Sequence, residues 1–242
     1  MIRVAAAGDL HVGVDSVGRL RPLLADLARD ADLFLLAGDL TQRGRPEEAK
    51  VLAAELDGLG VPTVAVLGNH DYHSGDQDAV TKVLEDAGIA VLEGSAVVVG
   101  VGDRRVGVAG TKGFGGGFAG ASASGFGEPE MKAFVSRSRK LARGLERALA
   151  GLRADRRIAL LHYSPVAETL AGEPRELYPF LGSYLLAEAV DRSGADLVLH
   201  GHAHRGSPIG MTPGGVPVRN VAVPVIGCAY QVFKFDADGV PA

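Results

Sequence analysis

Five short apolar runs in this chain each lead directly into residue types that bind metals, and this repetition limits the folds that the chain can adopt. Short apolar runs, three of them closed here by glycine, are typical of buried strands. Strands that lie side by side in one sheet bring their ends together, so we expect the residues after them to form one cluster. The sequence therefore predicts a metal site at the strand ends. The runs are residues 4–8, 33–38, 63–68, 158–161 and 197–199, and the residues that follow them include Asp9, His11, Asp39, Asn69, His70, Asp71, His162, His202 and His204.

The composition is that of a globular protein, with 47% hydrophobic and 22% charged residues among 242, and the length suits one domain over residues 1–242. The single cysteine, Cys228, excludes an intramolecular disulfide and a cysteine-based zinc site. The net charge of −4 argues against nucleic acid as a partner. No stretch approaches the ~20 apolar residues of a membrane span and no signal pattern is present, so we expect a soluble, cytoplasmic protein.

Helical patterns alternate with the apolar runs. Leucine and valine spacing predicts helices over residues 16–29, 46–59 and 76–87, and this alternation favours a mainly parallel sheet with helices on its faces. Two valine-rich stretches within residues 96–109 flank a turn and predict a hairpin, which would make the sheet mixed. Residues 216–235 are rich in valine, proline and glycine and predict further β structure.

Residues 110–127, extended to 130 at the widest, form a glycine-rich segment with no predicted secondary structure. Loops this long inside a compact domain are often functional. Two interpretations remain open: a flexible solvent loop, or a loop over the active site that contacts substrate through backbone amides, Lys112, Phe114 and Phe118. The sequence does not choose between them.

Residues 128–152 predict a long amphipathic helix with a basic stripe on one face. Such a stripe can bind a polyanion, but a solvated helix face is the more common explanation and the one we favour. The stripe consists of Lys132, Arg139, Lys140, Arg143 and Arg147.

The residues at the strand ends offer seven candidate ligands with both oxygen and nitrogen donor atoms. Seven ligands are too many for one tetrahedral ion and suit two ions of higher coordination. Asp39 has two carboxylate oxygens and can bridge two ions. Two ions about 3.5–4 Å apart can clamp the attacking and leaving oxygens of a displacement at phosphorus. The ligand set therefore predicts a two-metal phosphoester hydrolase.

The series of blocks resembles the calcineurin-like metallophosphoesterase superfamily. The blocks are Gly8-Asp9-Leu10-His11, Gly38-Asp39, Gly68-Asn69-His70-Asp71, His162 and Gly201-His202-Ala203-His204, in the order of that family. They span residues 8 to 204 and no signature position is substituted. The resemblance implies an α/β fold, a four-layer α/β/β/α sandwich of two mixed sheets flanked by helices.

The resemblance also implies the role of each residue. One metal would be held by Asp9, His11, Asp39 and His204, and the second by Asp39, Asn69, His162 and His202. His70 would be the catalytic histidine, with Asp71 orienting it and stabilising its charge. A hydroxide between the metals would attack phosphorus while His70 protonates the leaving oxygen. Donors of this mixture suit two divalent or trivalent ions among manganese, iron, zinc and nickel.

The expected activity is a phosphodiesterase on a small molecule, a preference that rests on the resemblance. A phosphomonoesterase or a nuclease is the alternative within the same superfamily, and a non-catalytic metal-bound scaffold is the alternative of a different class. Lys112 and His73 are candidates for substrate contact, although for His73 we slightly favour a position in a loop. We expect His200 to pack in the core or behind the ligands. The sequence does not indicate an oligomeric state.

Overall fold

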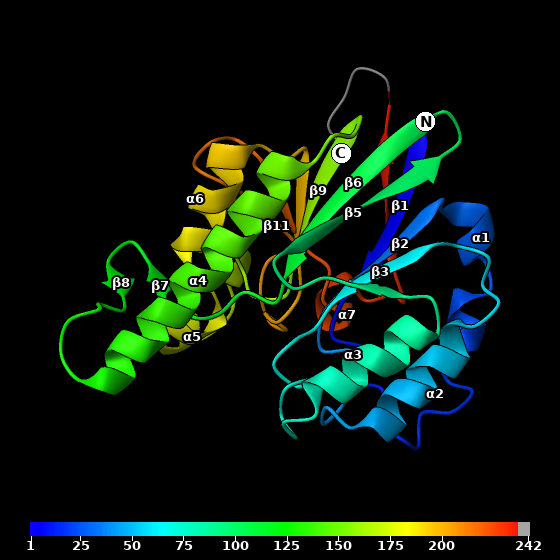
Figure 1. Ribbon diagram of the computed structural model, residues 1–242, viewed down its shortest axis with the longest axis horizontal. Helices are drawn as coiled ribbons and strands as arrows, with labels where there is room; N and C mark the ends of the chain where they lie inside the picture. Colours follow the sequence, from blue (N-terminus) through cyan, green and yellow to red (C-terminus); the bar gives the residue numbers. More distant parts are fainter. Residues whose placement is uncertain (237–242) are drawn as a thin grey trace.

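The computed structural model describes residues 1–236 and contains two large mixed sheets (Figure 1). Strands β1, β2, β3 and β4 of the first sheet are parallel, and β13 pairs with β1 in the antiparallel direction. The last six residues of the predicted single domain, 237–242, lie outside the described residues. In spatial order the first sheet consists of β13 (Gln231–Phe235), β1 (Ile2–Ala7), β2 (Leu33–Ala37), β3 (Thr63–Val66) and β4 (Ala90–Val91).

The second sheet contains the predicted hairpin at one edge, and the hairpin's strands pair in the antiparallel direction with the turn at residues 102–103. Its strands β6, β9, β10 and β12 are parallel to one another, and β11 is antiparallel to β12. In spatial order the sheet consists of β11 (Ile209–Met211), β12 (Pro217–Asn220), β10 (Leu197–His200), β9 (Arg156–Leu161), β6 (Arg104–Thr111) and β5 (Ser95–Val101). The C-terminal β structure predicted over 216–235 is therefore shared between the two sheets.

The apolar runs are continuous because both faces of their strands are buried. In β1, Val4 and Ala6 pack between the two sheets, whereas Ala5 and Ala7 pack toward the helices on the outer face. Successive side chains of a strand point to opposite faces, so a doubly covered strand needs apolar residues at every position. The same holds in β9, where Ile158 and Leu160 face the first sheet.

Helices cover both outer faces and complete the four layers that the family resemblance implied. Figure 1 shows α2 (Pro46–Leu56) and α3 (Gln77–Asp86) beside the first sheet, and α4 (Pro129–Gly151) and α6 (Tyr184–Ser193) beside the second. The helices predicted over 46–59, 76–87 and 128–152 are confirmed. The remaining helices are short: α1 (Leu27–Asp30), α5 (Tyr178–Leu181), α7 (Val223–Ile226) and the 3-10 turns η1 (Arg21–Leu24), η2 (Glu168–Leu170) and η3 (Arg175–Leu177). Within residues 1–236, none of them has the length and apolar character needed to cross a membrane.

The prediction of one helix over residues 16–29 is wrong. The segment forms turns, the η1 turn and the single-turn helix α1. Glu55 of α2 accepts hydrogen bonds from the backbone N–H groups of Gly18, Leu20 and Arg21, at 2.6, 2.9 and 2.7 Å. Those amides are therefore committed to a side chain from another element, and Gly18 has a positive φ of 74° that interrupts a helix.

The five ligand-bearing strands are divided between the two mixed sheets that the family resemblance implied. Strands β1, β2 and β3 lie in the first sheet, whereas β9 and β10 lie in the second. The ends of the two sheets still meet, because Gly8 after β1 donates to the carbonyl of Val221 at 2.8 Å and accepts from Val223 at 3.0 Å. The predicted cluster therefore forms at the junction of two sheets.

The glycine-rich segment after residue 110 is structured rather than open. Its first residues are buried, and a small hairpin of β7 (Gly117–Phe118) and β8 (Ala121–Ser122) follows. Gly116 donates to the carbonyl of Pro179 at 2.7 Å, and Gly117 donates to that of Gly182 at 2.9 Å. Residues 110–118 are thus anchored to the α5 region and do not form a flexible solvent loop, whereas residues 119–127 are almost all exposed.

Two neighbouring leucines test the fold assigned to the segment 16–29. Leu24 is 1% exposed and packs in the core outside the first sheet, whereas Leu23 is 62% exposed. We expect Leu24→Ala to lower the free energy of unfolding by about 2–5 kcal/mol, because it leaves a cavity. Leu23→Ala should change it by less than about 0.5 kcal/mol. Urea denaturation of both variants measures this, and equal losses would contradict the packing described.

Candidate metal centre

The turns after the ligand-bearing strands have an uncommon backbone conformation. Among residues 1–236, four non-glycine residues have positive φ: Asp9 (60°), His11 (45°), Asp39 (49°) and His202 (71°). All four are predicted metal ligands. Such conformations cost energy for residues with a side chain and persist where the surrounding structure enforces them, often at functional sites. The backbone therefore marks the same positions that the sequence motifs mark.

The first ligand group consists of Asp9, His11 and His204, whose potential ligand atoms all lie within 4.8 Å of one another. His204 Nε2 is 2.9 Å from Asp9 Oδ1, and the Nε2 atom of His11 is buried without a hydrogen-bond partner among residues 1–236. Burial favours the neutral acid of Asp9, but the hydrogen bond from His204 and the nearby imidazoles outweigh it and lower the pKa of Asp9. The same hydrogen bond raises the pKa of His204.

The second group consists of Asp39, His162 and His202, again within 4.8 Å of one another. His162 Nδ1 donates to the carbonyl of Ala37 at 2.9 Å, which leaves the lone pair of a neutral imidazole on Nε2. That Nε2 atom lies 2.9 Å from Asn69 Oδ1 and 3.3 Å from Asp39 Oδ1. Three electron-pair donors that face one another in this way suit a cation between them.

His202 completes this group as a neutral imidazole. Burial lowers its pKa well below 6.5, and its Nε2 atom is buried without a hydrogen-bond partner. A buried polar atom without a partner is costly, and the neutral imidazole is the form that binds metals. The unpartnered nitrogens of His11 and His202 therefore fit the metal ions that the ligand set predicts.

Asp39 lies between the two groups. Its Oδ1 atom is near His162, whereas its Oδ2 atom is 3.9 Å from Nε2 of both His11 and His70. The structure thus brings the seven predicted ligands together, with one carboxylate facing both groups. His70 joins His11 and Asp39 in a third set of potential ligand atoms within 4.8 Å, so it also lies at the centre.

Two motif glycines permit this close approach. A Cβ atom at Gly68 would lie 2.1 Å from Asp39 Oδ1, and one at Gly201 would lie 2.3 Å from Asp9 Oδ2. Side chains at these positions would displace the carboxylates. The glycines that precede Asn69 and His202 are therefore part of the geometry of the site.

The expectation that Asp71 orients His70 is not met. His70 Nδ1 is 2.9 Å from the backbone carbonyl of Gln42, which accepts its proton. The fully buried Asp71 carboxylate instead accepts hydrogen bonds from the amides of Leu40, Thr41 and Gly68, at 3.1, 2.8 and 2.7 Å. It also accepts one from the Thr41 hydroxyl at 2.6 Å. Asp71 therefore ties together the turns that carry Asp39 and His70.

No sequence signal could have identified Gln42, because it acts through its main chain. The remaining candidates belong to none of the ligand groups. His200 is buried, and its Nε2 atom is 2.8 Å from the Thr169 hydroxyl. Burial lowers its pKa to about 4, so it is a neutral histidine packed in the core. His73 is exposed in a turn after Asp71. Lys112 is buried close to Tyr163, the residue that follows His162.

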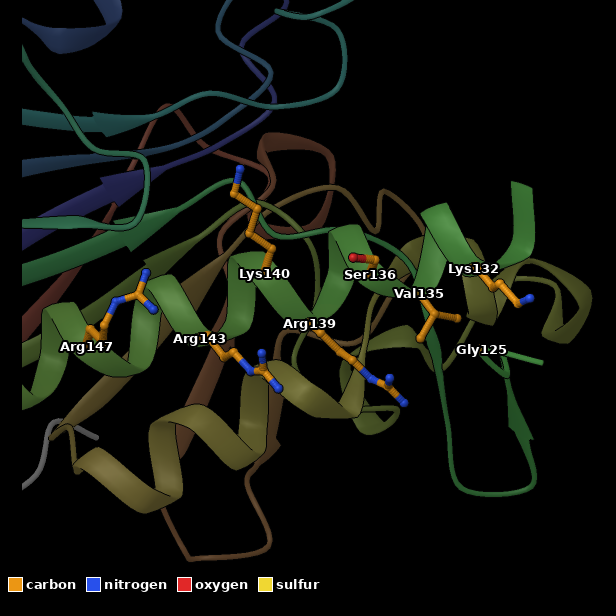
Figure 2. Close-up of a pocket in the computed structure, with 8 residues that line it drawn as sticks. All are labelled: Gly125, Lys132, Val135, Ser136, Arg139, Lys140, Arg143 and Arg147. Carbon is orange, nitrogen blue, oxygen red and sulfur yellow. The ribbon is translucent and has the colours of Figure 1, made fainter. Parts of the chain in front are cut away.

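The basic stripe lies on the exposed face of α4, where its side chains surround a surface hollow of about 570 Å³ (Figure 2). Val135, Ser136 and Gly125 also line the hollow, and none of the lining residues is a predicted metal ligand. In Figure 2 the basic side chains spread in several directions from the helix. This geometry agrees with a solvated face better than with one preformed anion site.

Comparison with known proteins places these observations in a family. A family model described as calcineurin-like phosphoesterase matches residues 2–206. A probable cyclic nucleotide phosphodiesterase from a Synechococcus strain is 36% identical over 80 residues, which are 29% of this chain and 31% of that protein. The chain thus matches under a third of that relative's length.

Solved structures share the fold at low sequence identity. Phosphopantetheinyl hydrolase from Mycobacterium tuberculosis is 15% identical with a TM-score of 0.71, and the match covers 99% of this chain and 98% of that one. A putative 5′-nucleotidase from Staphylococcus aureus is 17% identical with a TM-score of 0.60, covering 100% of this chain and 52% of that one. These matches show a common architecture.

Asp71→Asn tests the tie between the two turns. The amide nitrogen of asparagine would face backbone N–H groups, leaving at least one buried donor unsatisfied at about 1–3 kcal/mol each. We expect a loss of that size in the free energy of unfolding, measured by urea denaturation, together with weaker binding of manganese in calorimetry. The exposed Asp78→Asn is the matched control. Unchanged stability in Asp71→Asn would contradict the role of the carboxylate in the fold.

Proposed function

The chain belongs to the calcineurin-like phosphoesterase family, and from that membership we propose that it is a two-metal phosphodiesterase acting on a small molecule. The observation that carries the proposal is the meeting of two ligand groups on Asp39, with buried imidazole nitrogens on His11 and His202 that have no hydrogen-bond partner in the described part of the chain. Mixed oxygen and nitrogen donors in two adjacent groups suit two ions.

We assign the ligands as the family resemblance does. Asp9, His11, Asp39 and His204 would hold one ion, and Asp39, Asn69, His162 and His202 the other. When bound, such ions supply neutralisation of the phosphoryl oxygens and activation of the attacking water. The protein fixes the ligands for this task, since His162 is oriented by the Ala37 carbonyl and Asp9 by the amide of His202 at 2.9 Å.

We propose His70 as the general acid. Its backbone N–H donates to Asp39 Oδ1 at 2.8 Å, which fixes its position, and the Gln42 carbonyl fixes its ring through Nδ1. The ring is 45% exposed, so Nε2 is accessible to substrate from solvent. The protonated imidazole would donate to the leaving oxygen, and its tautomer would be set by Gln42 rather than by Asp71.

A diester is favoured over a monoester by the partial match to the probable cyclic nucleotide phosphodiesterase. That match covers 31% of that protein, so the substrate of this chain is inferred by analogy.

Metal removal tests the proposed chemistry. With manganese present, we expect hydrolysis of bis-p-nitrophenyl phosphate at a higher kcat/KM than p-nitrophenyl phosphate, because the site is proposed to act on diesters. Treatment with EDTA should reduce both rates to the uncatalysed level, and added manganese should restore them. Release of p-nitrophenol measures both reactions. Faster monoester hydrolysis would contradict the diester assignment, and no turnover by a protein with two bound ions would contradict catalysis itself.

His70→Ala separates catalysis from metal binding. Loss of a general acid typically costs about 10²–10⁴-fold in rate, so we expect kcat for bis-p-nitrophenyl phosphate to fall by that factor. The bound manganese, measured by elemental analysis, should remain at the wild-type level, and His202→Ala should lose manganese. Loss of one ion from His70→Ala would instead identify His70 as a ligand, in line with its place beside His11 and Asp39.

A further inference from the structure

Lys112 is a buried cation beside the candidate metal centre. Its side chain belongs to a residue only 4% exposed, and its Nζ atom lies 4.9, 5.0 and 4.9 Å from the ring centres of Tyr72, Phe114 and Tyr163. Within residues 1–236, Nζ forms no hydrogen bond or ion pair. Three aromatic rings thus surround an ammonium group whose three N–H donors have no protein acceptor.

The carboxylate of Glu93, whose charge acts on Lys112, is engaged by other donors. Glu93 accepts hydrogen bonds from the Thr111 hydroxyl at 2.7 Å, from the Tyr72 hydroxyl at 3.3 Å and from the backbone N–H of Lys112 at 3.4 Å. Aromatic faces attract the ammonium but offer no hydrogen-bond acceptor, so its N–H groups are left for water or a ligand. A mostly buried cation with donors free for a ligand is a candidate for a functional role.

The main chain holds Lys112 in a fixed position relative to the ligands. Its carbonyl accepts hydrogen bonds from the amides of His162 at 3.2 Å and Tyr163 at 3.0 Å. Gly113 follows with a φ of 75°, and a Cβ atom there would lie 3.0 Å from Leu186 and 3.1 Å from Tyr163. The turn that positions Lys112 is therefore closely packed.

The ammonium lies one aromatic ring away from a candidate ligand. The Tyr163 ring contacts Nζ of Lys112, and its centre is also 4.3 Å from the centre of the His202 ring. With the Tyr163 ring between them, the ammonium lies beside the ligand groups rather than among them. A phosphoester bound at the metal ligands would then present a neighbouring group, and not the ester itself, to Lys112.

We propose that Lys112 binds a second anionic group of the substrate, so that the enzyme prefers phosphodiesters carrying a further negative charge beside the ester that is cleaved. This proposal rests on the proposed phosphodiesterase function and specifies its substrate class.

Arg137 of α4 adds to the positive charge around this position. It is exposed and forms no ion pair within the described part of the chain. Burial lowers the pKa of Lys112 to about 8; the carboxylates of Glu93 and Asp39 act against this shift, and the positive charge of Arg137 acts with it. Lys112 therefore remains mostly protonated at neutral pH, and Arg137 adds positive charge to its surroundings.

Two synthetic diesters with the same leaving group test the proposal. Phenyl p-nitrophenyl phosphate has one negative charge, and 4-carboxyphenyl p-nitrophenyl phosphate has a second one. Since hydrogen bonds to charged groups are the strong ones, we expect the carboxylate to raise kcat/KM of the manganese-loaded wild type about tenfold. In Lys112→Met, which keeps an apolar chain in the aromatic surroundings, the two diesters should react equally. Lys50→Met on the exposed face of α2 is the matched control and should keep the wild-type preference.

A binding measurement makes the test independent of turnover. Calorimetry with manganese-loaded His70→Ala should give about tenfold tighter binding of the carboxylated diester, and His70→Ala/Lys112→Met should lose that difference. Arg137→Met, at an exposed position that should not disturb folding, should reduce the preference partly even if Lys112→Met proves unstable. Equal affinities of His70→Ala for the two diesters would overturn the proposal. So would a preference for the carboxylated diester that neither Lys112→Met nor Arg137→Met reduces. If His70→Ala binds the carboxylated diester more tightly but the manganese-loaded wild type hydrolyses neither diester, the result would count against the phosphodiesterase function alone.

Discussion

The carboxylate of Asp9 joins the ends of the two sheets, and the candidate metal centre depends on this junction. Asp9 follows β1 of the first sheet. It accepts hydrogen bonds from the backbone amide of His202 and from the imidazole of His204, two residues that follow β10 of the second sheet. It approaches the main chain of Gly201 so closely that no side chain fits there. A buried carboxylate needs such partners because desolvation disfavours its charge. The hydrogen bonds to Asp9 therefore hold the sheet ends together and position the candidate ligands at the same time.

Negative charge accumulates at this junction. Asp9, Asp39 and Asp71 are all at most 4% exposed. Burial raises the pKa of Asp71, and the nearby Asp39 carboxylate adds to that effect. The hydrogen bonds to Asp71 offset part of the cost, whereas Asp39 faces imidazole nitrogens on both sides. Cations bound between these groups would relieve the repulsion, so metal binding is expected to stabilise the folded state as well as to serve chemistry.

The sequence could predict the ligands because each depends on a local pattern, an apolar strand followed by a turn. It could not predict features that depend on distant partners. The amides of Gly18 and Leu20 are captured by Glu55, more than thirty residues away, so a helical leucine pattern does not become a helix. Likewise, Asp71 follows His70 in sequence but bonds to the turn of residues 40–41. The division of the strands between two sheets came from the family resemblance, because strand periodicity does not specify neighbours.

The order of the ligands along the chain has a consequence for biosynthesis. Each ligand group contains a histidine that follows β10, and β13, the edge partner of β1, comes later still. A nascent chain emerging from the ribosome therefore exposes Asp9, His11 and Asp39 well before His162, His202 and His204 are added. These early residues alone form neither complete group, so both groups can be completed only after β10 and the turn that follows it have been translated.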